Sequence, residues 1–363
     1  MEYCLSHHKS PSLPSTLRPH RSHNSSFPRS AVVSIRATTR RKRSLTVIAG
    51  PAGKALIGVL LNHPQLFHLS VADELKHLAD DRDAARNRMI RSDGSPEACL
   101  HRRIAQLKEN ECQVAVEDIM YLLIFYKFSE IKVPLVPRLS GCVYNGRLEI
   151  WPPKDWELES IYSFEVLEIV REHIAAVIGL RANSSITDHW AITTIAKSAL
   201  SRIYIASILY GYFLKSALLR LQLEQCVALD SQDLPLRQRT TVQHHGIKNL
   251  LFGRIGSIQS ESQSLDPSSQ EKKPENLKCY VMGFDPETLQ RCAKLKSKEA
   301  TSLIENHSSA LFGDEKTGSL DDDEVILTSF SSLKRLVLEA VAFGSFLWET
   351  EECVNTVYKL KEN

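Results

Sequence analysis

The sequence predicts a mainly α-helical protein, a helical bundle built from two related helical repeats with one small β-hairpin inserted in the first. Three observations lead to this prediction. Apolar residues recur at helical spacing along most of the chain, the two longest apolar helices resemble each other, and an Asn-Gly dipeptide separates two short strand-forming runs. The 363 residues are 43% hydrophobic and 24% charged, which is typical of a globular protein with one large or two modest domains.

The first segment, residues 1–43, has the composition of an organellar transit peptide. It is rich in Ser, Arg and Pro, and Glu2 is its only acidic residue. Its four prolines would interrupt the long amphipathic helix of a mitochondrial presequence, so we expect a plastid transit peptide with cleavage near Ala37. The basic run 40–43 leaves a nuclear localisation signal open, and a disordered basic tail is a further alternative.

The charge balance of the rest of the chain does not indicate a nucleic-acid partner. The whole chain has 45 Lys and Arg residues against 43 Asp and Glu residues. Residues 1–37 contain five of the basic residues and one of the acidic residues, which leaves 40 basic and 42 acidic residues after cleavage. A remainder with a formal charge of −2 lacks the basic excess that phosphate binding requires.

Three helices are expected before the hairpin. The first covers 52–62 and ends before Pro64, and the second runs over 71–91 with Ser70 as its N-cap. The third covers 96–128, with a possible break near Asn110, and begins at a Ser-Pro-Glu sequence. Its apolar stripe, expected to face the core, consists of Leu100, Ile104, Leu107, Val114, Ile119 and Leu123.

The hairpin is predicted at 142–151, because Asn145-Gly146 favours a two-residue type I′ turn, and a helical region over 155–180 follows it. Aromatic and basic residues surround the hairpin: Trp151, Trp156, Tyr162, Arg147 and Lys154. Such a cluster could stack on bases or bind an acidic peptide, but neighbouring Asp and Glu residues neutralise it. We therefore expect these aromatic residues to pack on the helices.

One long helix is predicted over 188–228. Its uncharged part, 203–214, has twelve residues between Arg202 and Lys215, whereas a membrane span needs about 20. We therefore predict a buried central helix and no transmembrane segment, with attachment to the thylakoid surface as an alternative.

The first repeat is placed at 52–228 and the second at 277–361. Residues 229–276 between them form a polar linker, which is expected to be flexible at 257–276 because it lacks apolar periodicity. Within the second repeat we expect a helix from 285 to about 311, an acidic loop at 313–324 and a last helix over 331–361.

The evidence for a duplication is a shift of 133 residues that aligns 198–215 with 331–348. Six of the 18 aligned positions are identical, against about one expected from average composition. The identical pairs are Ser198/Ser331, Leu200/Leu333, Arg202/Arg335, Gly211/Gly344, Phe213/Phe346 and Leu214/Leu347. The preceding helices match more weakly, through Leu107-Lys108 and Leu295-Lys296, and shared helical periodicity remains an alternative explanation.

Gly211 and Gly344 are the candidate contact residues between the two apolar helices. Glycine inside a helix costs about 1 kcal/mol relative to alanine, so its presence at both matched positions indicates a close approach of two backbones. Arg202 and Arg335 occupy matched positions on the N-terminal side of each helix and complete the predicted structural contact.

No sequence motif indicates catalysis. Phosphate-loop, dinucleotide-binding, zinc-protease and hydrolase motifs are absent, and the eight cysteines lack C-x-x-C spacing. We therefore predict no catalytic residue, cofactor or metal, and expect His189 to pack and His244-His245 to lie in a solvated loop. An enzyme with an unrecognised site between the repeats is the alternative, and its candidate residues are Glu117, Glu168, Glu172 and His173.

Four stretches resemble a plant and cyanobacterial family of plastid proteins described as UV-B-induced and defined only as a domain of unknown function. These are IWPPKDWELESIYS (150–163), ASILYGYFLKSALLR (206–220), CYVMGFDPETLQRCAKLKSKEATSLIENHSSALFG (279–313) and LKRLVLEAVAFGSFLW (333–348). The resemblance implies a plastid location and a repeated helical domain, and it supplies no catalytic residues. With the missing motifs, it favours a non-enzymatic stromal interaction or regulatory protein linked to light stress, with protein partners and an oligomeric state that the sequence does not specify.

Overall fold

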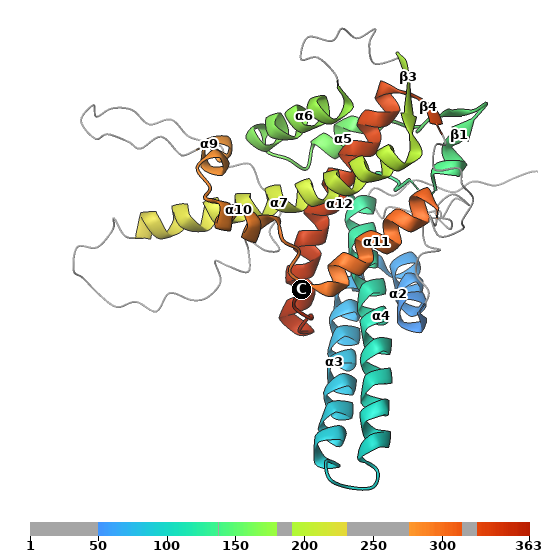
Figure 1. Ribbon diagram of the computed structural model, residues 1–363, viewed down its shortest axis with the longest axis vertical. Helices are drawn as coiled ribbons and strands as arrows, with labels where there is room; N and C mark the ends of the chain where they lie inside the picture. The colour runs from blue at the N-terminus through green and yellow to red at the C-terminus, as the bar shows by residue number, and fades with distance from the viewer. Residues whose placement is uncertain (1–49, 137, 180–190, 231–275, 314–324) are drawn as a thin grey trace, which may run out of the picture. The chain divides into compact units, whose positions relative to one another are not determined.

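The computed structural model describes residues 50–136, 138–179, 191–230, 276–313 and 325–363. It is mainly helical, with one small four-stranded sheet (Figure 1). The predicted transit peptide, the linker up to residue 275, the acidic loop from residue 314, His189 and His244-His245 lie outside the described residues.

The elements follow one another in this order along the chain. The helices are α2 (Pro51–Asn62), α3 (Phe67–Arg91), α4 (Ala98–Glu130), α5 (Asp155–Glu159), α6 (Phe164–Ile178), α7 (Lys197–Asp230), α9 (Leu277–Met282), α10 (Pro286–Ala293), α11 (Lys298–Phe312) and α12 (Phe330–Val357). The strands are β1 (Val143–Tyr144), β2 (Arg147–Leu148), β3 (Ile192–Ala196) and β4 (Val325–Ser329), and short 3-10 turns lie at Pro64–Leu66 and Leu139–Cys142.

The predicted hairpin is confirmed, although its strands are shorter than 142–151. β1 and β2 pair antiparallel through Val143 with Leu148 and Tyr144 with Arg147. Asn145 and Gly146 between them have φ angles of 50° and 74°, the left-handed conformation that a type I′ turn requires at both central residues.

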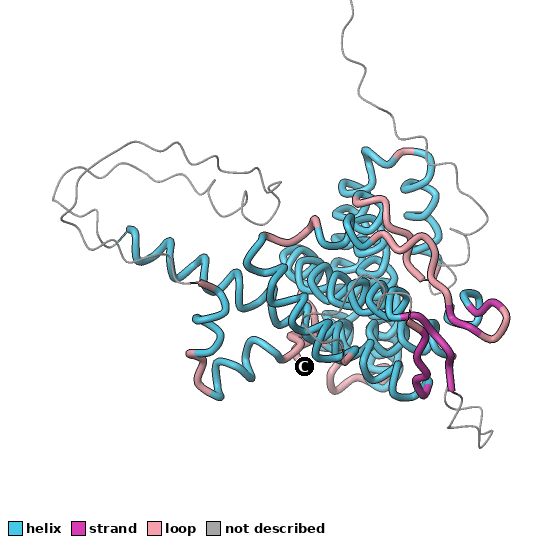
Figure 2. The backbone as a smooth tube through the Cα atoms, turned by 90° about the horizontal axis from the view of Figure 1, so that it is seen from above, coloured by secondary structure: helices cyan, strands magenta, loops and turns pink. Residues whose placement is uncertain are grey.

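The other two strands were not predicted. The sheet order is β1-β2-β4-β3, with β2 parallel to β4 and β3 antiparallel to β4, and Figure 2 shows the strands on one side of the helices. The prediction that a helix begins at 188 is therefore wrong, because Ile192–Ala196 forms a strand and α7 begins at Lys197. This five-residue strand is paired with residues 129 to 137 positions away, so local periodicity could not reveal it.

Other helix boundaries also differ from the predictions: the region over 155–180 forms two helices, α5 and α6, and α12 ends at Val357 instead of 361. α3 begins at Phe67, before the predicted N-cap Ser70, because a 3-10 turn leads directly into it and buries Phe67. The predicted helix over 285–311 is interrupted: α10 ends at Ala293 and α11 begins after Ser297, whose Oγ accepts a hydrogen bond from the N–H of Ala300 at 3.2 Å. α9 was not predicted.

The core forms around α12, whose side chains are buried along most of its length. α12 packs most extensively on α7 and also on α4, while α11 packs on both α4 and α7. Burying α12 on several sides explains why its sequence is apolar around most of the helix rather than along one stripe.

α3 and α4 form an antiparallel pair that only partly joins this core. In Figure 1 the turn between them lies far from α7 and α12. The predicted apolar stripe of α4 therefore divides in two: Ile119 and Leu123 are buried, whereas the four residues nearer its start are exposed. The expectation that the whole stripe faces the core is wrong for Leu100, Ile104, Leu107 and Val114, because they lie on a side of α4 that the other helices leave uncovered: Val114 is exposed although its neighbours Cys112, Ala115 and Val116 are buried.

Candidate functional site

The crossing of α7 and α12 is the closest helix contact involving the predicted residues. A Cβ atom built on Gly211 would lie 2.8 Å from the carbonyl carbon of Val341, and one built on Gly344 would lie 2.8 Å from that of Ile208. Each contacted residue precedes the glycine of its own helix by three positions, so the contact is reciprocal. Because real Cβ atoms do not approach carbonyl groups so closely, only glycine fits at both positions without a shift of the helices.

The two predicted arginines have different environments. Arg335 is 1% exposed, lies 2.8 Å from Glu339 in an ion pair and donates a 3.0 Å hydrogen bond to the carbonyl of Pro134. Glu339 accepts hydrogen bonds from the backbone N–H of Val136 at 3.0 and 3.2 Å. Arg202 is exposed, so the structure does not bring the two matched arginines into one contact.

A buried Tyr–His pair lies beside this ion pair and was not singled out from the sequence. The hydroxyl of Tyr204 is 2.9 Å from Nε2 of His307, whose ring stacks on Phe343 with centroids 4.3 Å apart. Burial lowers the pKa of His307 to about 4, so the imidazole is neutral near pH 7. Burial also raises the pKa of Glu339, which the Arg335 guanidinium opposes. One feature of the sequence could have indicated the buried ion pair: Glu339 follows Arg335 by four residues in an otherwise apolar helix.

A second buried carboxylate joins α7, α11 and α12. Glu351 accepts a 2.5 Å hydrogen bond from the Tyr212 hydroxyl and bonds of 2.7 and 2.5 Å from the N–H and Oγ of Ser297. Desolvation raises the pKa of Glu351, and these hydrogen bonds act in the opposite direction. Glu351 thus holds the start of α11, because Ser297 is the N-cap of that helix.

The four residues considered for an unrecognised catalytic site are not brought together. Glu117 lies on α4, where the Ser302 hydroxyl donates to it at 3.0 Å and burial raises its pKa. On α6, His173 lies 3.1 Å from the Ser207 hydroxyl and stacks on Tyr210, whereas Glu168 and Glu172 are exposed, the latter in an ion pair with Lys278.

Two of the three aromatic residues around the hairpin do not pack on the helices as predicted. Trp151 and Trp156 are 70% and 80% exposed, because Leu148 and Ile150 fill the space between the hairpin and the helices. Tyr162 alone turns inward, with its hydroxyl 3.5 Å from that of Ser345. Arg147 and Lys154 form ion pairs with Glu149 and Glu157.

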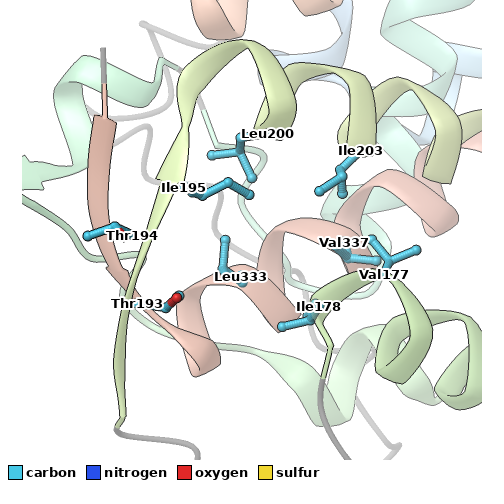
Figure 3. A pocket seen from close by; sticks show the side chains of 9 residues that line it. All are labelled: Val177, Ile178, Thr193, Thr194, Ile195, Leu200, Ile203, Leu333 and Val337. Atoms are coloured by element: carbon cyan, nitrogen blue, oxygen red, sulfur yellow. The ribbon is translucent and has the colours of Figure 1, made fainter. Parts of the chain in front are cut away.

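An apolar pocket of about 160 Å³ lies between the end of α6, β3, the start of α7 and α12 (Figure 3). Its lining residues are Val177, Ile178, Thr193, Thr194, Ile195, Leu200, Ile203, Leu333 and Val337. None of these side chains is titratable, and the two threonines are the polar ones. The pocket can hold a small apolar group, and it offers no acid, base or nucleophile of the kinds that general acid–base catalysis uses.

The exposed half of the α4 stripe is a row of four apolar residues on one helix face. Leu100, Ile104, Leu107 and Val114 are 57%, 42%, 53% and 48% exposed. Their spacings of four, three and seven residues place them along one side of the helix. The side of α4 that faces α3 is a different one, because Lys108 lies 3.2 Å from Asp81 and the Cys112 thiol lies 3.6 Å from the carbonyl of Leu78.

Two kinds of site are absent from the described residues. Among the described residues, no group of three or more His, Cys, Asp or Glu side chains is placed to hold a metal ion. No helix in the described part of the chain is sufficiently long and apolar to cross a membrane.

The fold is that of a mainly helical protein with a small mixed sheet, and sequence comparison places it in a family. The chain belongs to the family described as "Protein of unknown function (DUF760)", whose model matches residues 99–227 and 276–355. It is 37% identical over 325 residues to a UV-B-induced chloroplastic protein of Arabidopsis thaliana, which covers 86% of this chain and 76% of that relative. No solved structure matches the chain significantly. The resemblance identified from the sequence is therefore confirmed.

Proposed function

We propose that the protein is a non-enzymatic protein of the chloroplast stroma that acts in the response to light and UV-B by associating with a protein partner. The chloroplast location is supported by the chloroplastic relative and by the transit-peptide composition of residues 1–43. The link to UV-B is supported by the description of the same relative.

The observation that carries an association function is the exposed stripe of α4. Monomeric proteins expose single apolar residues commonly, but an ordered row along one helix face is typical of a binding surface. The row of Leu100, Ile104, Leu107 and Val114 has the alternating spacing by which two helices pack on each other.

The buried titratable groups support a structural rather than a catalytic role for the core. Arg335 and Glu339 bind each other and the backbone after α4, Tyr204 binds His307, and Glu351 binds Ser297, the N-cap of α11. Each of these side chains is engaged by the protein itself, and none of them is among the residues that line the pocket in Figure 3.

The proposed architecture is a pair of related helical repeats. The 133-residue shift that aligns α7 with α12 also aligns β3 with β4 end to end, since Ile192 corresponds to Val325 and Ala196 to Ser329. The two strands pair antiparallel with each other, and the glycine contacts at the helix crossing are reciprocal. An approximate twofold relation between the units accounts for all three observations.

The weaker match between the preceding helices does not extend this relation. Leu107 lies within α4, whereas Leu295 lies between α10 and α11. The support for the repeats therefore comes from the strand–helix units that end in α7 and α12.

Binding of a small apolar molecule is a second candidate function, favoured by the pocket in Figure 3. An apolar cavity of about 150 Å³ can hold a molecule the size of benzene. Replacing Leu333 by Trp would fill the pocket, and loss of binding of a small aromatic probe measured by calorimetry would test this candidate.

The experiment for the association function uses isolated chloroplasts. The full chain and the variant Ile104→Glu/Leu107→Glu are imported, and the stromal fraction is separated by native size. We expect the full chain in an assembly larger than the monomer and the variant at monomer size. Leu223→Glu, which changes another leucine that is 46% exposed on a helix, is the matched control. Recovery of the full chain as a monomer, in the membrane fraction or outside the chloroplast would contradict the proposal.

A further inference from the structure

The exposed stripe of α4 has opposite charges at its two ends. Arg103 lies near its start and Glu111 near its end, whereas Glu109 faces away from the stripe and is paired with Arg86 and Lys361 of the same chain. Arg103 and Glu111 are both exposed and lie four residues before and four residues after Leu107. Leu100 and Val114 are therefore symmetric about Leu107, and Arg103 and Glu111 are antisymmetric in charge, whereas Ile104 has Asn110 at its mirror position.

This arrangement is complementary to itself when reversed. In an antiparallel pair of α4 helices centred on Leu107, a residue before Leu107 faces the residue that lies equally far after Leu107 in the other copy. Arg103 therefore lies opposite Glu111 of the other copy, and Leu100 lies opposite Val114. The charge pair and the apolar pair each form twice, as the twofold symmetry of an isologous interface requires. A parallel pair would instead place Arg103 beside Arg103 and Glu111 beside Glu111.

We propose that the α4 stripe is the interface of a homodimer, in which the α3–α4 pairs of two copies associate antiparallel about Leu107. This inference rests on the proposed association function and identifies the partner as a second copy of the chain. Four helices then pack together, with the stripe residues forming the contact between the two helix pairs.

The charge of Glu111 also argues against a lipid surface as the binding partner of the stripe. Helices that lie on anionic membranes carry basic residues on the polar face beside the apolar one. Glu111 is 69% exposed at the side-chain level and lies among the stripe positions, between Leu107 and Val114. Its carboxylate would meet the negative lipid headgroups, whereas the reversed copy offers it Arg103. Within the same chain, Glu111 has Lys108 at 3.4 Å, so its interaction with Arg103 adds to an existing exposed ion pair.

The test measures the mass of the purified full chain in solution by sedimentation equilibrium over a dilution series. We expect a species of twice the 40.9 kDa chain mass that dissociates on dilution. Ile104→Glu/Leu107→Glu should yield a monomer with an unchanged circular dichroism spectrum, since both side chains are exposed. Leu223→Glu should leave the dimer intact.

Charge exchange tests the antiparallel register. Arg103→Glu alone and Glu111→Arg alone should each raise the dimer dissociation constant about tenfold, because each leaves two like-charged contacts. The double variant Arg103→Glu/Glu111→Arg should restore dimerisation. A chain that stays monomeric at every concentration, a dimer that persists in the Ile104→Glu/Leu107→Glu variant, or a double variant as weak as the single ones overturns the inference.

The result of the sedimentation experiment can be distinguished from the result of the chloroplast experiment. A purified chain that is monomeric, combined with a stromal assembly that depends on Ile104 and Leu107, would overturn the homodimer and retain the association function with a different protein. A stromal monomer would contradict the association function itself.

Discussion

At the residue scale, the contact between α7 and α12 depends on two glycines, which have no side chain. The backbones meet where Gly211 faces the carbonyl of Val341 and Gly344 faces that of Ile208. Glycine has the lowest helix propensity of any residue except proline. The two glycines therefore lower the stability of each helix but allow the two long helices to pack closely.

Gly211→Ala and Gly344→Ala should each destabilise the protein by about 1–3 kcal/mol, because the added methyl group would force the helices apart. The gain in helix propensity of about 1 kcal/mol acts in the opposite direction and is smaller than the packing loss. Urea unfolding measures the change. Gly58→Ala is the control, since Gly58 lies in α2 with no atom within 4 Å of the new Cβ, and it should be neutral or stabilising. Two stabilised crossing variants would show that the helices do not meet there.

His307 should make folding stability depend on pH. Its folded-state pKa of about 4 lies below the unfolded value of about 6.5, so between these values the unfolded state binds a proton that the folded state excludes. The free energy of unfolding therefore falls as the pH drops from 6.5 towards 4, by up to about 1.4 kcal/mol per pH unit from this residue.

His307→Gln should flatten the pH dependence in that range, as measured by urea unfolding at several pH values. The pKa values of His68 and His173 are also lowered by burial, and both residues remain in the variant, so the difference between the two proteins isolates His307. Parallel pH profiles would mean that His307 is accessible to protons in the folded state.

At the element scale, the hairpin and the strands after it differ in how they are specified. The β1–β2 turn is local, since Asn145 and Gly146 adopt positive φ angles by themselves. β3 and β4 are specified by each other, because each supplies the other's backbone hydrogen-bond partners across a long stretch of chain.

Gly146→Ala should destabilise the hairpin by about 1 kcal/mol, because a residue with a Cβ is strained at a φ of 74°. Gly141→Ala is the matched control: it lies in the preceding 3-10 turn, has no atom within 4 Å of the new Cβ and does not have a positive φ. Thermal unfolding should show a lower Tm for the first variant and no loss for the second. Equal melting temperatures would contradict the type I′ turn.

At the scale of the whole molecule, the two segments matched by the family model depend on each other. α12 is buried along most of its length and packs on α7, α4 and α6 of the first segment, and the buried Arg335 and Glu339 find backbone partners after α4. Either segment alone would expose this apolar surface and leave a charge pair without its hydrogen bonds.

Residues 50–230 and 276–363 expressed as separate chains should therefore fold only together. We expect each fragment alone to aggregate and the two to co-purify as a soluble complex when they are produced in one cell, with the helical circular dichroism of the intact protein. The same pair carrying Gly344→Leu should fail to associate, because leucine cannot fit against Ile208. A fragment that folds cooperatively by itself would show that the segments are independent domains.

The sequence by itself determined the features whose cause is local. Helical periodicity and proline positions predicted most of α2, α4, α7 and α12, and Asn145-Gly146 predicted the hairpin, because turn and helix geometry act over a few residues. The matched glycines indicated a close helix contact, since their cost inside a helix is visible without knowing the partner. The family was also recognisable from four stretches of sequence.

The tertiary structure alone decided the features whose cause lies far along the chain. β3 and β4 form because they meet each other, and Arg335 is buried while the matched Arg202 is exposed because only the former has Glu339 and the Pro134 carbonyl nearby. Periodicity likewise could not separate the buried from the exposed half of the α4 stripe. Both sides of the helix carry apolar residues, and only the positions of the neighbouring helices determine which side is buried.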